Sequence, residues 1–468
     1  MTNHSCNSMI TIADDVIIAV FRFLDMRSLL SASLVCRRWY LLTQDSSLWT
    51  DLDLAQYSTK LQPAAIHRLL SQSFAPLGRR LSLATCAVNS ETLVCVRQRC
   101  HSLHILNLND AVVHSTSSGH GSEGVREHLR SLRMLDMRNS RGSMDEIKHF
   151  LRSAENLEGL GLHSTFRSSL AHQVFSSKPH LRVLDCGRCD AIDDFSVTTI
   201  ATNCHELEYL SLSRCYNYLG NSLPILLRNC RHLTTLLLNG TRVSGDAVVE
   251  AHWSNTVIEA LDLRHCAHLD DLAITTVLIL LPRLRYLRCP LSDENCKLMQ
   301  YRGFPDAEVL QILRRYPITI DTLCSLLIGC DQVRHLDVSS IPFAQEHFDV
   351  FLTRMQSLRS LCLAANDSSG TDRIVRKIAQ HSRHLESLWI VYYHSCRQQN
   401  MMRAFSNLIQ RCCSLHTVNL TGLYVNDLLC ELQQHKKENW PHRHIRFLQN
   451  EDFVLPQPKL CLDSLMKF

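Results

Sequence analysis

A short leucine phrase recurs at a nearly constant spacing, and this repetition constrains the fold more than any other feature. Residues 204–241 show it most clearly, because Leu210 and Leu212 follow Cys204 and the phrase begins again at Cys230. Its L-x-x-L-x-L core alternates with a period of two, as in a strand with one buried face. The next dozen residues have the apolar spacing of a helix. One such unit cannot bury its own apolar face, so we expect the units to stack.

The phrase occurs along most of the chain. Its predicted strand cores are Leu52/Leu54, Leu81/Leu83, Leu106/Leu108, Leu135/Met137, Leu160/Leu162, Leu184/Cys186, Leu210/Leu212, Leu236/Leu238, Leu261/Leu263, Leu287/Cys289, Leu336/Val338, Leu361/Leu363, Leu388/Ile390 and Val418/Leu420. Most spacings are about 24–27 residues, within the range of leucine-rich repeats. The interval from Leu287 to Leu336 is close to two periods, and Leu310-x-Ile312 in its middle predicts a degenerate repeat near residues 290–330.

The repeat predicts an α/β fold of the leucine-rich-repeat horseshoe type. A helix after each strand makes the outer side wider than the strand side, so the parallel sheet lies on the concave face and the helices on the convex face. Asp193/Asp194 and Asp270/Asp271 precede apolar runs, and we expect them to cap helices. We assign residues 51–439 to the repeats and residues 440–468 to a C-terminal tail. A last strand is expected around Ile445–Leu448.

Charge and hydropathy exclude several classes of protein. A formal net charge of +4 over 468 residues gives no general reason to expect a nucleic-acid partner. The longest fully apolar stretch lies near Val277–Leu281, far short of the roughly 20 residues that a bilayer span needs. The N-terminus lacks both the basic start and the apolar core of a signal peptide. We therefore expect a soluble, intracellular chain with no membrane partner.

The 21 cysteines follow the repeat. Five stand three residues before the first apolar position of a phrase, and three stand eight residues after one: Cys100, Cys204, Cys230, Cys330 and Cys412, then Cys189, Cys215 and Cys266. A thiol that recurs at one position is typical of a small buried hydrophobe with a weak S–H donor. The repeat also explains the C-x-x-C of Cys186 and Cys189, and no second such pair completes a metal site. We expect reduced thiols and neither metal nor cofactor.

Residues 11–49 do not follow the repeat. Thr11 and Asp14 have the spacing of a capping box, and apolar residues at three-and-four spacing follow them. Asp25 is placed to cap a second helix, and a third helix carries Trp39. Three short helices make a very small core, so binding of a partner would help to stabilise it.

Residues 10–50 resemble an F-box, the motif that docks onto the small adaptor subunit of cullin-based (SCF) ubiquitin ligases. The chain supplies, in the order of the family pattern, Asp14, Asp15, Val16, Phe21, Leu24, Leu29, Leu30, Val35, Cys36, Arg38, Trp39, Leu48 and Trp49. It has Ile12-Ala13 where the family has Leu-Pro, which loses the pre-set φ of proline. The chain as a whole is similar to the family that joins an F-box to cysteine-containing leucine-rich repeats.

The resemblance implies a non-catalytic substrate-recognition subunit located in the cytoplasm, the nucleus or both. Its implied partners are the adaptor subunit, through it the cullin scaffold, and an unidentified protein substrate. The expected adaptor-binding residues are Ile12, Val16, Phe21, Leu24, Leu29, Leu30, Val35 and Trp39. Some of these must instead form the core of the segment, and the sequence does not separate the two sets. A leucine-rich-repeat scaffold or inhibitor that acts outside a ligase is the alternative.

Arginine and aromatic residues are expected on the concave face, where a substrate would bind. They are Arg138, Arg188, Tyr209, Arg214, Arg264, Tyr286, Arg288, Arg314, Trp389 and Tyr392. These residue types dominate protein interfaces, and arginine also suits carboxylate or phosphate groups. Alternatively, the arginines pair with the interleaved Asp136, Asp185, Asp262 and Asp337 in a solvated ladder worth ~0–1 kcal/mol for each pair. The sequence leaves open whether the tail covers this face. We find no catalytic motif.

Overall fold

The computed structural model describes residues 12–74, 77–114, 129–142, 144–162, 166–281, 283–292, 295, 306–314, 330, 332–342, 352–353, 356–365, 371–392, 400–421, 425–453, 455–458 and 460–467. The chain divides into two compact units. Unit 1 comprises Met1–Tyr209 and Leu460–Phe468, and unit 2 comprises Leu210–Lys459.

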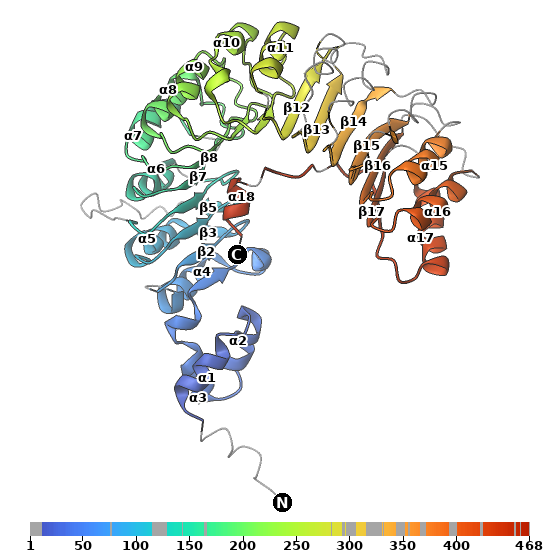
Figure 1. Cartoon of the computed structure of the whole chain (residues 1–468). Helices are drawn as coiled ribbons and strands as arrows, with labels where there is room; N and C mark the ends of the chain where they lie inside the picture. Colours follow the sequence, from blue (N-terminus) through green and yellow to red (C-terminus); the bar gives the residue numbers. More distant parts are fainter. Residues whose placement is uncertain are drawn as a thin grey trace, which may run out of the picture. The chain divides into compact units, whose positions relative to one another are not determined.

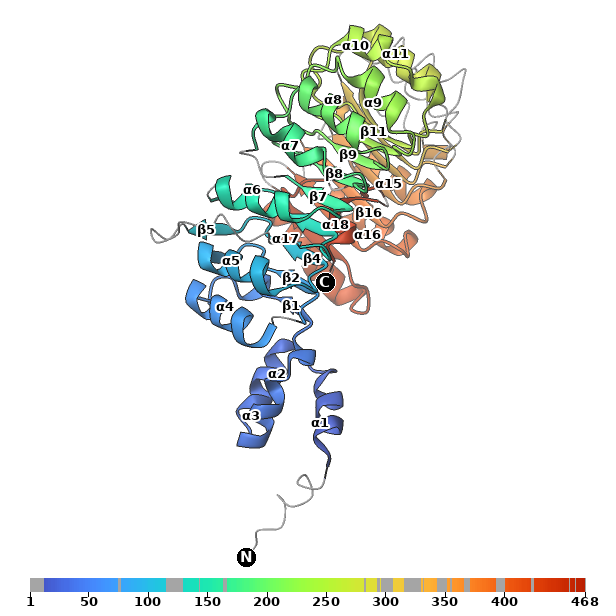
Figure 2. The ribbon, with the colours of Figure 1, turned by 90° about the vertical axis from the view of Figure 1, so that its left-hand side faces the viewer.

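Unit 1 begins with three short helices, α1 (Asp14–Phe21), α2 (Met26–Ser33) and α3 (Arg37–Thr43), and a 3-10 turn η1 (Ser46–Leu48). Figures 1 and 2 show them projecting beyond the β1 end of the unit 1 sheet. As predicted, the Asp25 side chain caps α2, since it accepts a hydrogen bond of 2.8 Å from the Ser28 N–H.

The sheet of unit 1 is parallel, and its strands pair in the order of the sequence. They are β1 (Asp51–Asp53), β2 (Arg80–Ser82), β4 (Ile105–Asn107), β6 (Met134–Asp136), β7 (Gly159–Gly161) and β8 (Val183–Asp185). A second, two-stranded parallel sheet joins β3 (Ala87–Asn89) to β5 (Val112–His114). The strand β9 (Tyr209–Ser211) lies at the division between the units.

Helices cover one face of the unit 1 sheet, and a C-terminal turn of helix lies on the other (Figure 1). The covering elements are α4 (Pro63–Leu69), η3 (Leu70–Phe74), α5 (Ser90–Arg99), α6 (Met144–Ser153), α7 (Ala171–Phe175) and α8 (Asp194–Asn203), with the short turns η2 (Ala55–Tyr57) and η4 (Ser168–Leu170). The opposite face carries α18 (Leu462–Leu465), which packs against β7 and β8. We call this opposite face the open face.

Unit 2 continues the same pattern of parallel strands. They are β10 (Thr235–Leu237), β11 (Ala260–Asp262), β12 (Tyr286–Leu291), β13 (Val309–Arg314), β14 (His335–Pro342), β15 (Ser360–Ala365), β16 (Ser387–Tyr392), β17 (Thr417–Thr421) and β18 (Arg446–Gln449). Its described helices are α9 (Leu223–Asn229), α10 (Gly245–Glu250), α11 (Asp271–Leu280), α15 (Thr371–His381), α16 (Met401–Arg411) and α17 (Asn426–Asn439), with the turn η5 (Trp253–Asn255). Strand β18 confirms the last strand that the sequence predicts around Ile445–Leu448.

The leucines of the phrase lie in register and form the core of each unit. In unit 1, Leu52 pairs with Leu81 and the series continues to Leu184. In unit 2, Leu287 pairs with Leu310, which pairs with Leu336, so β13 occupies the position of the degenerate phrase. The strand cores thus confirm the predicted leucine-rich-repeat fold. Asp193 and Asp270 cap α8 and α11 as expected.

A left-handed backbone conformation recurs just after the strands. The second residue beyond the core phrase has φ between 55° and 70°, as at Asn139 and Gly240. In this conformation its N–H continues the ladder into the next repeat, as when Asp110 donates to the Arg138 carbonyl at 3.0 Å. Glycine and asparagine tolerate this conformation with little strain.

The recurrent cysteines are buried, as predicted, and serve two local roles. Cys100 and Cys412 end helices α5 and α16. The Cys266 thiol instead donates to the Leu238 carbonyl of the preceding repeat at 3.1 Å. Burial raises the pKa of the Cys100 and Cys412 thiols to about 12. None of the helices in the described part of the chain is long and apolar enough to cross a membrane.

Candidate functional sites: a helical surface and the open sheet face

The three-helix segment has a small core built around two aromatic rings. Phe21 and Trp39 meet edge to face, with ring centroids 5.1 Å apart. Ile17 and Leu29 are buried beside them. Trp49 closes the segment onto the end of α3, because its indole N–H donates to the Thr43 carbonyl at 2.8 Å. Few buried side chains therefore hold these helices together.

The predicted capping box at the start of α1 is wrong. The N-cap is Ala13, whose methyl side chain cannot accept a hydrogen bond. Asp14 is already the first helical residue, and its carboxylate pairs with the Arg38 guanidinium at 2.6 Å. Arg38 also donates to the Ile12 carbonyl, so it ties the start of α1 to α3. Thr11 lies outside the described residues.

The structure separates the eight expected adaptor-binding residues into two sets. Phe21 and Leu29 are each 3% exposed and belong to the core, and Trp39 is half-buried against Phe21. The remaining five residues are exposed: Ile12, Val16, Leu24, Leu30 and Val35. Only this second set is available to a partner on the surface of the segment.

Sequence reasoning missed the most exposed apolar side chains of the segment. Phe23 is 90% exposed and Leu34 is 86% exposed, and Val20, Tyr40 and Leu41 are exposed as well. Ten of the nineteen exposed large apolar side chains in the described residues thus lie between Ile12 and Leu41. The sequence did hold a signal of this exposure. Phe23 and Leu34 follow the last residues of α1 and α2, so they lie outside the helical spacing that marks the buried positions. Such a concentration of apolar surface is typical of a site that another protein covers.

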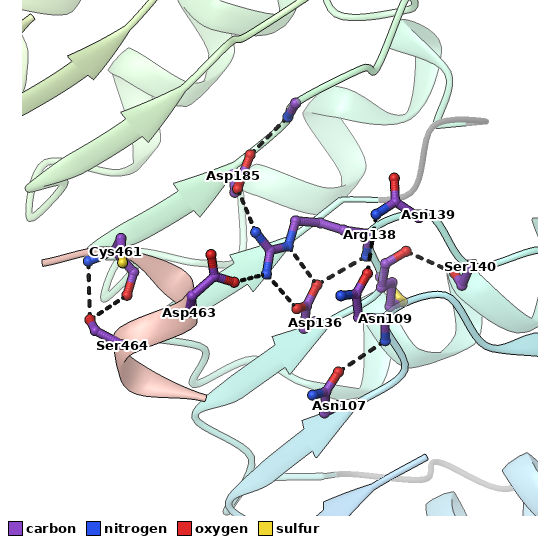
Figure 3. Close-up of polar contacts among 12 residues, drawn as sticks. Asn107, Asn109, Asp136, Arg138, Asn139, Ser140, Asp185, Cys461, Asp463 and Ser464 are labelled. Carbon is purple, nitrogen blue, oxygen red and sulfur yellow. Dashed lines mark hydrogen bonds and ion pairs between the residues drawn. The ribbon is translucent and has the colours of Figure 1, made fainter. Parts of the chain in front are cut away.

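The open face of unit 1 carries a charged cluster centred on Arg138 (Figure 3). The guanidinium donates to Asp136 at 2.8 and 3.0 Å and to Asp185 at 2.9 Å. It also contacts Asp463 of the C-terminal segment. Asp136 is only 1% exposed, so Arg138 is the cation that compensates its buried charge. Burial lowers the pKa of Arg138, but hydrogen bonds and attraction from Asp136 raise it by more, so the guanidinium stays charged.

The C-terminal segment of unit 1 lies on this cluster. Leu462 is 1% exposed, and its methyl groups face Gly159 and Gly161 of β7. The Ser464 hydroxyl accepts from the Cys461 N–H at 3.2 Å and closes the single turn of α18. The Arg80 guanidinium donates to the Lys467 carbonyl at the far end. The open face of unit 1 therefore binds a peptide segment in this structure.

Tyr209, an expected substrate-binding residue, lies under the same segment. It is 4% exposed. Burial raises the pKa of its phenol, and the nearby Asp185, Cys461 and Asp463 raise it further. Arg138 and Tyr209 are therefore brought together on this face, as the sequence led us to expect, but α18 covers them.

The open face of unit 2 carries a longer polar chain. Arg264 pairs with Asp262 at 2.7 Å and donates to Gln311 at 2.9 Å. Gln311 in turn donates to Asp337 at 2.6 Å. Arg288 lies 3.8 Å from Asp262. Asp262 thus accepts hydrogen bonds from Arg264 of its own repeat, and Asp337 accepts one from Gln311 of the neighbouring strand.

Part of the C-terminal tail, at Glu451, Phe453 and Pro456, contacts side chains of the unit 2 strands on the face that corresponds to the open face of unit 1. The rings of Trp389 and Phe453 have centroids 4.9 Å apart. The Asn419 amide donates to the Glu451 carbonyl, and Arg288 donates to the Pro456 carbonyl at 3.4 Å. Of the expected substrate-binding residues, Trp389 and Arg288 are thus contacted by this stretch of the tail.

The five expected arginines whose side chains the structure describes do not occupy equivalent positions. Arg138 and Arg264 directly follow the core phrase and fold back over the aspartate two residues earlier. Arg188 and Arg214 stand one position later, in turns with φ of 64° and 62°, and are exposed. Arg288 lies inside β12. Periodicity places each arginine within or just after a strand, but a shift of one residue there changes where the side chain lies.

Three further expected substrate-binding residues are Tyr286, Arg314 and Tyr392. Tyr286 is half-buried, and burial raises its pKa. The side chains of Arg314 and Tyr392 lie outside the described part of the structure.

The C-x-x-C pair follows the repeat. Cys186 and Cys189 are buried in the repeat positions that the sequence assigns to them. Among the described residues, histidine, cysteine and acidic side chains form no group of three or more that could hold a metal ion.

Comparison with known proteins finds a match at the N-terminus. Residues 14–55 match the family model of F-box-like segments. Among solved structures, the chain is similar to one in the complex of Rad7 and Elc1 in yeast, at 15% identity over 90% of this chain and 94% of that one, with a TM-score of 0.46. It is also similar to a chain in the complex of TLR13 with single-stranded RNA, at 15% identity over 77% of this chain and 55% of that one, with a TM-score of 0.45. A third similar structure is LegL7 from Legionella pneumophila, a leucine-rich-repeat protein, at 15% identity over 60% of this chain and 87% of that one, with a TM-score of 0.36.

Proposed function

We propose, because residues 14–55 form an F-box-like segment, that this chain is the substrate-recognition subunit of an SCF-type ubiquitin ligase. One observation carries the proposal: within the described residues, exposed large apolar side chains are most concentrated in this same segment. Burying one such side chain in an interface contributes about 1.5–3 kcal/mol. Several of them together provide the affinity that an adaptor subunit would need.

The adaptor and the substrate would bind to different parts of the chain. The helices α1 to α3 would hold the adaptor subunit and through it the cullin scaffold. The open sheet faces would hold a protein substrate, since the aromatic and arginine residues on which the C-terminal segment now lies are of the types that dominate interfaces. The chain itself would carry no catalytic residue. Ubiquitin transfer would follow from the raised local concentration of substrate lysines near the conjugating enzyme.

The test is affinity capture of the full chain from cells under proteasome inhibition. We compare the wild type with a Phe23→Asp/Leu34→Asp variant, whose substitutions lie at the exposed apolar surface. The control is Phe195→Asp, which places one such carboxylate at an exposed phenylalanine of α8. The proposal predicts that the double variant loses the adaptor and cullin while keeping its substrates, which then accumulate in cells. Equal recovery of the adaptor with all three chains would contradict it.

Failure of the wild type to retain any adaptor would favour a leucine-rich-repeat scaffold or inhibitor that acts outside a ligase. The proposed role also implies location in the cytoplasm, the nucleus or both. Imaging of the tagged full chain would test that implication.

A further inference from the structure

The open face of unit 1 contains a slot that side chains would otherwise fill. Alternate residues of a strand share one face, so Gly159 and Gly161 are the open-face positions of β7. The registered positions on β6 are Met134 and Asp136. On β8 they are occupied by Val183 and Asp185. Two glycines at successive open-face positions therefore leave a gap between two rows of larger side chains.

Leu462 occupies this gap together with the end of the Met134 side chain. A Cβ atom at position 161 would come within 2.7 Å of one Leu462 methyl carbon. A Cβ at position 159 would lie 2.2 Å from the Met134 methyl carbon and 3.4 Å from the other Leu462 methyl carbon. Any side chain at position 161 would also collide with Asp136 and Arg138. The glycines thus permit both the leucine to enter and the Asp136–Arg138 pair to form beneath it.

Polar groups around the slot fix the direction of the segment that fills it. Arg138 contacts Asp463 on one side, and Arg80 donates to the Lys467 carbonyl on the other. The Asp463 side chain remains 67% exposed, and Arg138 is already bonded to two buried carboxylates. The leucine therefore supplies most of the binding, and the aspartate mainly sets its orientation.

We propose that the open face of unit 1 is a peptide-binding site for a one-turn helix with a leucine-sized residue followed by an acid, and that the chain's own C-terminal segment occupies it. A protein substrate with such a turn would enter the slot only after α18 leaves. The C-terminal segment would then limit substrate binding, because it is present at a high effective concentration. This inference rests on the proposed function only in assigning the slot to a substrate.

The test uses the full chain and a fluorescein-labelled peptide with the sequence of residues 460–468. A Leu462→Asp substitution in the chain should release α18, because it removes the apolar contact and places a carboxylate next to the buried Asp136, whose charge Arg138 already compensates. The matched control is Leu465→Asp on the same turn, where the leucine is 37% exposed. Fluorescence anisotropy measures peptide affinity. We expect the Leu462→Asp chain to bind the peptide at least tenfold more tightly than the wild type or the Leu465→Asp chain.

Peptide variants test the chemistry without changing the protein. Replacing the peptide's leucine at position 462 with alanine should weaken binding to the Leu462→Asp chain by about thirtyfold. Replacing the aspartate at position 463 with asparagine should weaken it only a few fold. Equal binding by wild type and Leu462→Asp, no binding to a Leu462→Asp chain that retains its circular dichroism, or no effect of the alanine peptide would each overturn the proposal.

The assay contains no adaptor subunit, so its failure would leave the proposed ligase role intact. Conversely, a chain that fails to bind the adaptor could still bind the peptide. The two proposals are therefore tested separately.

Discussion

Replacing Arg138 with leucine tests whether the open-face charges form a structural network or a solvated ladder. The change removes the cation and keeps the apolar part of the side chain. Asp136 is 1% exposed and Asp185 is 9% exposed, so both carboxylates lose their main compensating charge while they remain largely buried. Arg138 itself has a side chain only 16% exposed, so solvent screens these contacts weakly.

The expected cost follows from this burial. Removing one partner of a buried ion pair destabilises a protein by about 3–5 kcal/mol, because an uncompensated charge stays behind. A surface ladder would instead change stability by ~0–1 kcal/mol. The two interpretations thus differ by several kcal/mol. Repeats contact mainly their neighbours, so the loss should concentrate in strands β6 to β8.

Native-state amide exchange of the full chain measures this local stability strand by strand. Arg188→Leu is the matched control, because Arg188 is exposed in the turn after β8 and should change local stability by less than about 0.5 kcal/mol. Adding Asp136→Asn to Arg138→Leu should recover part of the loss, since it removes one stranded charge. The reasoning is refuted if Arg138→Leu and Arg188→Leu have the same small effect.

Three further predictions concern stability and reactivity. Leu29→Ala should destabilise the helical segment by about 2–5 kcal/mol in thermal unfolding, because Leu29 is buried in its small core. Burial lowers the pKa of Lys178 from 10.5 to about 8. Between pH 8 and 10.5 the Lys178 amine therefore binds a proton more tightly in the unfolded chain than in the folded one. The free energy of unfolding from urea titrations, measured relative to the Lys178→Met variant, should rise with pH over this range. A flat difference would contradict this. Iodoacetamide should label exposed Cys36 well before Cys266, whose pKa burial raises to about 11, as mass spectrometry of the peptides would show.

The repeat fold could be predicted from sequence because each of its signals is local. Leu310 and Ile312 sit in a weak phrase, yet the constant spacing places them in register with Leu287 and Leu336. Helix caps such as Asp193 depend only on residues three positions away. These interactions leave a pattern in the sequence whether or not the distant parts of the chain are known.

The two candidate sites depended on contacts that periodicity does not encode. In helices of seven or eight residues, buried Leu29 and exposed Leu30 are equally apolar, and only packing separates them. The docking of Leu462 depends on contact with residues about 300 positions earlier in the chain. One local signal was present, since Gly159 and Gly161 interrupt the row of open-face side chains, but two glycines do not reveal which segment fills the gap.

The most direct test of the proposed function is isothermal titration of the purified full chain with the purified adaptor subunit. The account predicts saturable one-to-one binding at micromolar concentration or below, and loss of that binding in Phe23→Asp/Leu34→Asp but not in Phe195→Asp. A wild-type chain that shows no heat of binding at tens of micromolar adaptor would contradict the ligase role.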